Sequence, residues 1–338
     1  MSKSTLRISV VLAGAVAKGA FEAGVLQALS EKSVEIVRVV GSSSGALNGT
    51  LLASAVRTGQ VARGAAQLVE LWRDQAGWTD VFHASFGVLK TRQGVSDSAK
   101  VLDLLRRTIQ PSPTGNEIDL RLLVAPLAGT AGTIGLHPAT TYEAMLQFTG
   151  KDFATTDSLA RVFAGATASS AFPLVFAPVQ VEGLGPCVDG GAVNNTPLKW
   201  ALDGTLHDQI DAIVVVGTQP EVRIGPPPAD MHAVELASHL ANMLIGERLY
   251  RDLHEACDVN AGLARLDELV TQGVLDSSQL GAVRTAIGWD GFRNVNIIEV
   301  RPLDELPGSS FSGFFDAKLR DQYIDAGLAR ARDALASL

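Results

Sequence analysis

Short apolar runs rich in β-branched residues alternate along the chain with segments whose apolar positions recur every three to four residues. The strand-like runs lie at 7–12, 35–40, 120–125, 174–181, 213–217 and 295–300. Such near-continuous runs are typical of strands buried on both faces, and the helical segments between them can serve as crossovers of a parallel sheet. The pattern predicts an α/β fold with a largely parallel central sheet covered by helices on both faces.

The length of 338 residues allows one large α/β domain or two ordinary ones. No internal repeat or low-complexity tract divides the chain. The Pro-rich stretch at 224–230 is interpreted as a loop inside one domain, because it leads into a helical pattern from His232 to about Leu253. We therefore expect a single domain over 1–338, with a motif-bearing core at about 7–217, a helical segment at about 231–290, and a closing strand and helix at about 295–335.

The composition limits the classes of partner. With 46% hydrophobic and 19% charged residues, the chain can bury a sizeable core. The net charge of −8, without a long run of one sign, argues against nucleic acid as a partner and against charge-driven docking on anionic lipid. Any contact with lipid would therefore be apolar. Cys187 and Cys257 match neither a metal-ligand spacing nor a disulfide framework, and both are interpreted as buried apolar residues.

The N-terminal segment admits two interpretations. Lys3 and Arg7 precede an apolar run and a small-residue stretch at 15–17, as in a secretory signal peptide. The run also continues through a loop into apolar positions of helical period at 21–29, which favours the first strand and helix of an α/β domain. No apolar run reaches the ~18 residues that a transmembrane helix needs. We expect a cytoplasmic protein that can associate with membranes, and secretion without a cleaved signal peptide is compatible with the sequence.

The stretch Gly41-Ser-Ser-Ser-Gly45 lies between a predicted strand and a predicted helix. A nucleophile elbow needs this context, since its sharp turn presents a Ser outward and requires small residues two positions to either side. Only Ser43 has Gly at both of these positions, and its hydroxyl would lie at a helix N-terminus, which favours developing negative charge. A Ser-rich phosphate-binding turn and a plain turn are the alternatives.

A second small-residue turn, Ala13 to Ala20, follows the first strand. Adjacent parallel strands would place it beside the elbow, where its backbone N–H groups could form an oxyanion hole. The alternative is a dinucleotide or nucleotide phosphate loop. It fits poorly because Val16 occupies the middle Gly position of Gly-x-Gly-x-x-Gly, Lys18-Gly19 is not the Gly-Lys pair of a P-loop, and Gly41-Ser42 stand where a ribose-binding carboxylate should follow the second strand.

A Ser nucleophile needs a base, and the usual α/β-hydrolase order of Ser, acid and His finds no convincing histidine here. Three of the six histidines fall in helix-like sequence and three in no recognisable turn motif; they are His232, His239 and His254, and His83, His137 and His207. Asp189 is the better candidate, because it ends a strand-like segment and enters a tight turn at Gly190-Gly191. An ordinary turn is the alternative for this tripeptide.

Four aromatic residues, Trp72, Trp78, Phe82 and Phe86, cluster between the second and third predicted strands, where the segment 77–91 is irregular. Core packing is one explanation of such a cluster. A mobile cap over an apolar cleft is the alternative.

Taken together, these features resemble the patatin-like phospholipases. Four blocks agree in order: the loop from Gly14 to Gly19 with the helix start at 20–26, the elbow from Gly41 to Gly45, the stretch 168–176, and Asp189-Gly190-Gly191 followed by Asn194-Asn195-Thr196-Pro197. The resemblance covers about residues 7–217, with a weaker echo at 311–327.

The resemblance implies a three-layer α/β/α fold and hydrolysis of acyl esters in phospholipids, lysophospholipids or neutral lipids, with no obligatory metal or cofactor. It implies a Ser–Asp dyad without His, in which Ser43 is the nucleophile and Asp189 the base. The oxyanion hole would come from the backbone of Gly14, Ala15, Val16 and Ala17, supported by Gly41, Gly45, Lys18, Gly19, Gly190 and Gly191.

The chain departs from the family pattern in this loop. The family usually has Gly where this sequence has Ala15 and Val16, and a β-branched residue strongly disfavours positive φ. Since backbone donors survive any side chain, the oxyanion hole could persist if position 16 takes a negative φ. Lys18 matches the family's basic position, either as a solvated surface residue or as one that positions the loop. The departure keeps open a catalytically silent lipid-binding or scaffold protein, and a thioesterase or protein deacylase on the same site is a further alternative.

Overall fold

The computed structural model describes residues 5–82, 96–134, 137–173, 175–202, 209–220, 233–336 and 338. At its centre lies a sheet in the order β10-β9-β1-β2-β3-β8-β7, with β6 also paired to β3. The strands that pair in parallel are β10 (Asn296–Val300), β9 (Ala212–Val216), β1 (Leu6–Leu12), β2 (Val34–Gly41) and β3 (Asp119–Pro126). Antiparallel pairings add β6 (Ala144–Thr149), β8 (Gly185–Asp189) and β7 (Val179–Val181).

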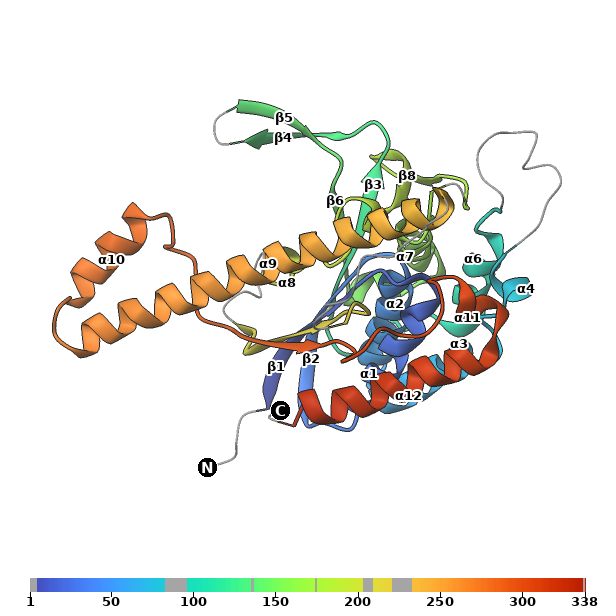
Figure 1. The fold of residues 1–338 in the computed structure, drawn as a ribbon, viewed down its shortest axis with the longest axis horizontal. Helices are drawn as coiled ribbons and strands as arrows, with labels where there is room; N and C mark the ends of the chain where they lie inside the picture. The colour runs from blue at the N-terminus through green and yellow to red at the C-terminus, as the bar shows by residue number, and fades with distance from the viewer. Residues whose placement is uncertain are drawn as a thin grey trace.

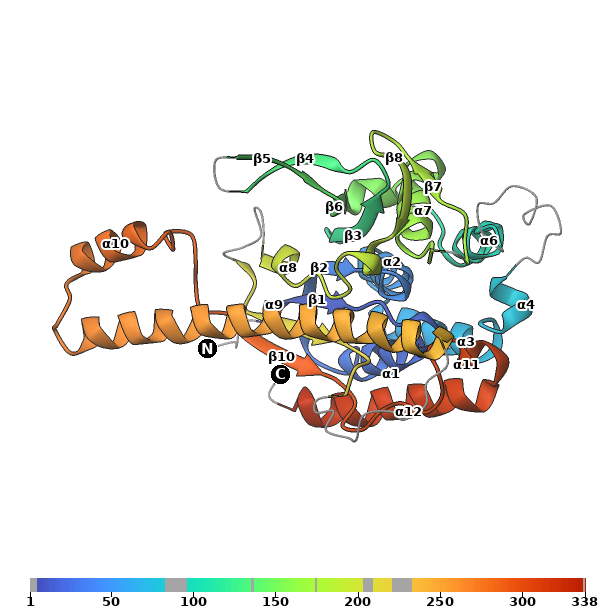
Figure 2. The same ribbon diagram turned by 45° about the horizontal axis from the view of Figure 1, so that its top comes forward.

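Helices cover both faces of this sheet, as the alternating pattern predicts (Figure 1, Figure 2). One layer holds α1 (Ala20–Leu29), α2 (Ser44–Arg57), α3 (Val61–Asp74), α7 (Thr156–Ser169) and α12 (Ala317–Ala334). The other holds α8 (Lys199–Leu202) and α9 (Ala233–Thr271), which pack on the sheet through residues such as Leu249 and Leu253. The fold is therefore mixed α/β, with a mainly parallel sheet between two helical layers.

The remaining elements lie around this frame. Figure 1 shows the β4–β5 hairpin beyond the sheet and α10 at the far end of α9. Their bounds are Thr130–Ile134 for β4, His137–Thr141 for β5, Trp78–Val81 for α4, Ala99–Thr108 for α6, Ser277–Ala286 for α10, Ser312–Phe315 for α11, and Val16–Gly19, Gly150–Phe153 and Gly190–Ala192 for the 3₁₀ helices η1, η2 and η3.

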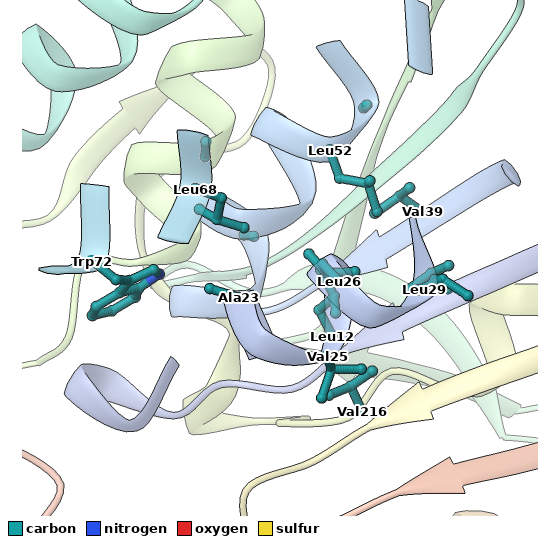
Figure 3. Close-up of a cluster of buried hydrophobic side chains, with 14 of the residues drawn as sticks. Leu12, Ala23, Val25, Leu26, Leu29, Val39, Leu52, Leu68, Trp72 and Val216 are labelled. Atoms are coloured by element: carbon teal, nitrogen blue, oxygen red, sulfur yellow. The ribbon is translucent and has the colours of Figure 1, made fainter. Parts of the chain in front are cut away.

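A buried apolar cluster joins the central strands to the first helical layer (Figure 3). Leu12, Val39 and Val216 come from three neighbouring strands and lie with Leu26 of α1 and Leu52 of α2. The apolar run of the N-terminal segment is thus strand β1, which is paired on both sides, with β9 and β2. Because β1 and β2 are parallel neighbours, the turns after their carboxyl ends lie side by side.

Helices α1 and α12 are in unusually close contact because glycines face backbone at their crossing. A Cβ atom at Gly24 would lie 2.0 Å from the carbonyl oxygen of Ile324, and one at Gly327 would lie 2.0 Å from that of Phe21. Any larger side chain at either position would push the two helices apart. The helix that follows the first small-residue turn is therefore fixed by a helix much later in the chain.

Two sequence-based boundaries are wrong. The strand predicted at 174–181 reduces to β7, and Phe176 makes only an isolated bridge with Ser96. Pro173 and Pro178 explain the difference, since proline has no N–H to donate to a β-ladder. The helix predicted to end at about Leu253 continues to Thr271, through sequence that contains no proline. The Pro-rich stretch at 224–230 lies outside the described residues.

The two cysteines differ in exposure. Cys187 is buried in β8, whereas Cys257 is exposed on α9, so the prediction of two buried cysteines is wrong for Cys257. An exposed position is possible there because a long helix that covers a sheet buries only one side of its surface. In the part of the chain that the structure describes, no helix is both long and apolar enough to cross a membrane.

Candidate active site

The turn between β2 and α2 has the geometry of a nucleophile elbow. Ser43 lies between the last residue of β2 and the first of α2, with φ 56° and ψ −127°. A Cβ atom at Gly41 would lie 2.5 Å from the carbonyl oxygen of Gly45, and one at Gly45 would lie 2.4 Å from that of Leu12. Neither Gly41 nor Gly45 has a positive φ. The glycines are thus required for close backbone approach, and the strained conformation falls on the serine itself.

Ser43 and Asp189 are joined directly. The Ser43 hydroxyl donates a hydrogen bond of 2.6 Å to Asp189 Oδ2, and the Gly191 amide donates one of 2.7 Å to Asp189 Oδ1. Burial raises the pKa of Asp189 to about 7, although both hydrogen bonds favour the ionised form. A carboxyl group with this pKa can accept a proton from a hydroxyl near neutral pH more readily than an ordinary Asp.

The turn after β8 holds Asp189 against its neighbours. A Cβ atom at Gly190 would lie 2.2 Å from the carbonyl oxygen of Leu123 in β3, and one at Gly191 would lie 2.7 Å from Asn195 Oδ1. The backbone can therefore turn into η3 directly after the carboxylate only because both positions lack a side chain. This close turn directs Asp189 toward the end of β2, as the Asp-Gly-Gly pattern predicts.

The turn after β1 lies against the same site, and most of its amides are already engaged. Gly14 N–H donates to the Asn195 backbone carbonyl at 3.0 Å, and Ala15 N–H donates to Ser44 Oγ at 2.9 Å. Ala17 N–H donates to a backbone carbonyl at 3.0 Å. Among the described residues we find no acceptor for Val16 N–H. Of the four expected oxyanion donors, the structure leaves Val16 as the available one, since hydrogen bonds that form the loop occupy the others.

Val16 does not adopt the negative φ that its β-branched side chain favours. Its φ is +53°, so the loop keeps the positive φ that a β-branched residue disfavours. Within the described residues, Val16 and Ser43 are the only non-glycine residues with positive φ. Such strain persists only where surrounding contacts hold the backbone in place. The two strained residues lie in neighbouring turns, one of which carries Ser43 itself.

Three polar residues that the motifs did not single out for a role support the two turns. Asn195 Nδ2 donates to the Gly14 carbonyl at 2.7 Å, so Asn195 binds Gly14 through both its side chain and its backbone. The Ser169 hydroxyl accepts the Ser43 N–H at 3.1 Å. The Ser44 hydroxyl accepts a hydrogen bond from the Ala15 N–H of the first turn. The N–H of Ser44, which is the first in α2, has no acceptor in the described part of the chain. Its place directly after Ser43 was the signal that could have marked its N–H as a candidate oxyanion donor.

The other expected support residues lie in η1. Lys18 is half-buried there, and Gly19 is buried at its end. A Cβ atom at Gly19 would lie 2.9 Å from Ser44 Cβ and 2.9 Å from Trp72 Cζ2. The glycine therefore allows η1 to pack against the start of α2.

An apolar pocket with a cavity volume of about 110 Å³ lies beside Ser43. Its walls include Val16, Leu47, Trp72, Phe82, Phe176 and Phe314. Stacked rings lead from solvent to this pocket: Phe315, which is 68% exposed, stacks on Trp78 at 4.7 Å, Trp78 on Phe82 at 4.0 Å, and Phe82 on Phe176 at 5.3 Å. The predicted aromatic cluster thus borders an apolar cleft, while Phe86 lies outside the described residues.

Among the described side chains, no histidine has a hydrogen bond to Ser43 or Asp189. His137 is exposed on β5, and His254 is exposed on α9 beside Asp258. His83, His207 and His232 lie outside the described residues, and His239 lies in α9.

Comparisons with known proteins agree with the four sequence blocks. The model of the patatin-like phospholipase family matches residues 10–202, which is more than half of the chain. No curated protein matches the sequence. Among solved structures, VipD from Legionella pneumophila is similar with a TM-score of 0.44 and 12% sequence identity, over 98% of this chain and 67% of that one. The family match confirms the resemblance: the chain belongs to the patatin-like phospholipase family.

Proposed function

We propose that this protein is a serine acyl-ester hydrolase of the phospholipase A or lysophospholipase type, acting through a Ser43–Asp189 dyad. The observation that carries the proposal is the 2.6 Å hydrogen bond to the buried carboxylate of Asp189 from the hydroxyl of Ser43, a residue that lines an apolar pocket. Family membership supports the class of lipid acyl hydrolases. The dyad, the substrate and the direction of the reaction are the parts that we add.

In the first half of the reaction, Asp189 takes the proton of Ser43 while the oxygen of Ser43 attacks the ester carbonyl carbon. The carbonyl oxygen becomes an oxyanion in the tetrahedral intermediate, and the amides of Val16 and Ser44 are the donors available to it. Asp189 then returns the proton to the leaving alcohol as the carbon–oxygen bond breaks. The product is an acyl-enzyme on Ser43.

In the second half, water replaces the alcohol. Asp189 accepts a proton from a water molecule while the oxygen of that water attacks the acyl carbon. The same proton passes to Ser43 Oγ when the fatty acid leaves. Each step moves one proton between groups already in contact with the reacting atoms, so the cycle calls for no metal or cofactor. The ionised form of Asp189 starts both halves, and activity should therefore rise with pH and level off above about 7.

The apolar pocket suits the acyl chain of a lipid. Its position beside Ser43 would place a hydrocarbon chain along apolar side chains with the ester at the serine. The exposed end of the aromatic stack, at Trp78 and Phe315, would contact a lipid surface through apolar and aromatic groups. This mode of contact agrees with a net charge of −8, which disfavours docking through basic residues.

The test of the dyad uses a fluorophosphonate probe together with hydrolysis of nitrophenyl esters, lysophosphatidylcholine, phosphatidylcholine and an acyl thioester. We expect covalent labelling at Ser43, none in Ser43→Ala, and turnover of at least one lipid ester. A folded wild-type protein that neither labels nor hydrolyses any ester would favour the silent lipid-binding protein, for which the strain at Val16 is the specific observation. Faster turnover of the thioester than of every oxygen ester would favour the thioesterase alternative.

The lipid-surface contact is tested separately with Ser43→Ala protein and phosphatidylcholine vesicles. Trp78→Ala and Phe315→Ala should each weaken cosedimentation with the vesicles. Phe292→Ala is the matched control, because Phe292 is an aromatic residue that is 45% exposed and lines no part of the pocket. Equal weakening by all three substitutions, or by none, would contradict docking through the aromatic stack.

A further inference from the structure

Glu22 is a carboxyl group in the interior of the fold that the proposed reaction does not use. It lies in the first turn of α1, and none of its surface is exposed. Its Oε2 accepts a hydrogen bond of 2.7 Å from Asn48 Nδ2. Burial raises the pKa of Glu22 well above its usual range, and the Asn48 and Ala13 amide dipoles oppose this shift only in part. Burial therefore favours the neutral, hydrogen-bonding form of this carboxyl.

Asn48, the partner of Glu22, connects three parts of the site. Its Nδ2 also donates to the Gly19 carbonyl at 3.0 Å, and its Oδ1 accepts from Trp72 Nε1 at 2.9 Å. Both hydrogens of the amide and its oxygen thus have partners, so the side chain has one satisfied orientation. Gly19 ends η1, and Trp72 forms part of the pocket wall. The amide of Asn48 therefore fixes the end of the first turn relative to the pocket.

The strained Val16 lies between two such attachments. Asn195 holds the loop at Gly14, and Asn48 holds it at Gly19. A positive φ at a β-branched residue needs constraint on both sides, because the residue otherwise relaxes toward the β region. Without Glu22, one hydrogen of the Asn48 amide loses its buried acceptor, and the amide can reorient away from Gly19.

We propose that Glu22 is a positioning residue for the acyl-transfer site: it orients Asn48, which holds η1 in place and thereby keeps the Val16 amide available to the oxyanion. The inference rests on the proposed function for its catalytic consequence. The role requires a hydrogen-bond acceptor at position 22 and does not require a charge. Glutamine, whose amide oxygen can accept from Asn48, should therefore replace Glu22, whereas leucine of similar size should not.

The experiment compares Glu22→Leu with Glu22→Gln in hydrolysis of a short-chain nitrophenyl ester. We expect Glu22→Leu to lower kcat at least tenfold with little change in KM. This loss in kcat is a part of the ~10²–10³-fold effect of losing an oxyanion donor. Glu22→Gln should retain kcat within about threefold of the wild type, since a positioned acceptor remains. Leu29→Ala, a buried change at the far end of α1, is the control for destabilisation without loss of positioning.

Two outcomes would overturn the inference: an unchanged kcat in Glu22→Leu, or an equal loss in Glu22→Gln. If Glu22→Leu does not fold, Asn48→Ala is the alternative variant, because it removes the same connection. The space left by the shortened side chain opens into the pocket that Asn48 lines. Hydrogen exchange of residues 13–20 gives a readout without catalysis. Exchange should accelerate in Glu22→Leu but not in Glu22→Gln, so failure of the proposed reaction and failure of the Glu22 role can be distinguished.

Discussion

The two turns beside the dyad place the same strain in different kinds of residue. The turn from Gly41 to Gly45 puts positive φ on Ser43, whose side chain is the proposed nucleophile. The turn from Gly14 to Gly19 puts it on Val16, whose proposed part in the reaction is its backbone amide. In the elbow, the proposed role of the side chain requires the strained residue to be a serine. In the turn from Gly14 to Gly19, any residue that the loop can hold at positive φ can supply the backbone amide.

The two turns are also held by different means. The elbow is continuous with regular elements, since β2 ends at Gly41 and α2 begins at Ser44. The first turn depends more on side-chain hydrogen bonds, from Ser44, Asn48 and Asn195. We therefore expect the elbow to fail through changes at its own residues, and the first turn to fail also through changes at distant ones.

The largest effect is expected at the elbow. Ser43→Ala should lower ester hydrolysis by at least about 10⁴-fold, because it removes the nucleophile. Ser42→Ala is the matched control: its hydroxyl is buried without a hydrogen-bond partner among the described residues, so turnover should stay within about threefold. Similar losses at both serines, measured on folded protein, would show that the turn is structural.

Asp189→Asn should lower kcat by roughly 10²–10⁴-fold, because Asn cannot accept the proton of Ser43. Its effect on stability depends on pH. The folded wild-type protein keeps the Asp189 proton up to about pH 7, whereas the unfolded chain releases it near its usual pKa of ~4, so ionisation destabilises the fold progressively between these values. The Asn variant should therefore gain thermal stability relative to the wild type at pH 8 but not at pH 4. A constant difference across this range would contradict the raised pKa.

Gly14→Ala tests the first turn by steric overlap. The added Cβ would lie 2.2 Å from Asn195 Oδ1 and 2.7 Å from Ser43 Cβ. Because the added Cβ would displace both Asn195 and Ser43, kcat should fall by about 10²-fold, as for other small misplacements of reacting groups. Gly281→Ala is the control, since that glycine is helical and a Cβ there meets nothing within 4 Å. Normal turnover in Gly14→Ala would remove this loop from the site.

The smallest effect is expected from Val16→Gly. Glycine adopts positive φ without strain, which offsets the lost apolar contact and the greater freedom of the unfolded chain. Turnover should change less than about tenfold, because the amide that would bind the oxyanion is kept. A loss comparable to that of Gly14→Ala would show that the valine side chain, and not its backbone, matters to the site.

The sequence predicted the sheet, both turns and the two members of the proposed dyad because each leaves a local pattern. Apolar runs mark buried strands, and Gly41 and Gly45 are required by contacts within a few residues and with the neighbouring strand. The φ of Val16 was not predictable, since it results from attachments through Asn195 and Asn48, which lie far apart in sequence. The start of the strand predicted at 174–181 was wrong for a local reason, because Pro173 and Pro178 were visible in the sequence.

The close contact between α1 and α12 has a consequence for the time at which the site forms during synthesis. Gly24 and Gly327 lie at the crossing of these helices, and α1 begins directly after η1. While the ribosome is still making the intervening chain, from α2 to α11, α1 lacks the partner against which it packs. The loop before it then lacks the support of the docked helix, which leaves the strained Val16 backbone less firmly held. A nascent chain of this kind would carry Ser43 and Asp189 long before it could use them, which would delay the proposed hydrolysis until α12 has docked.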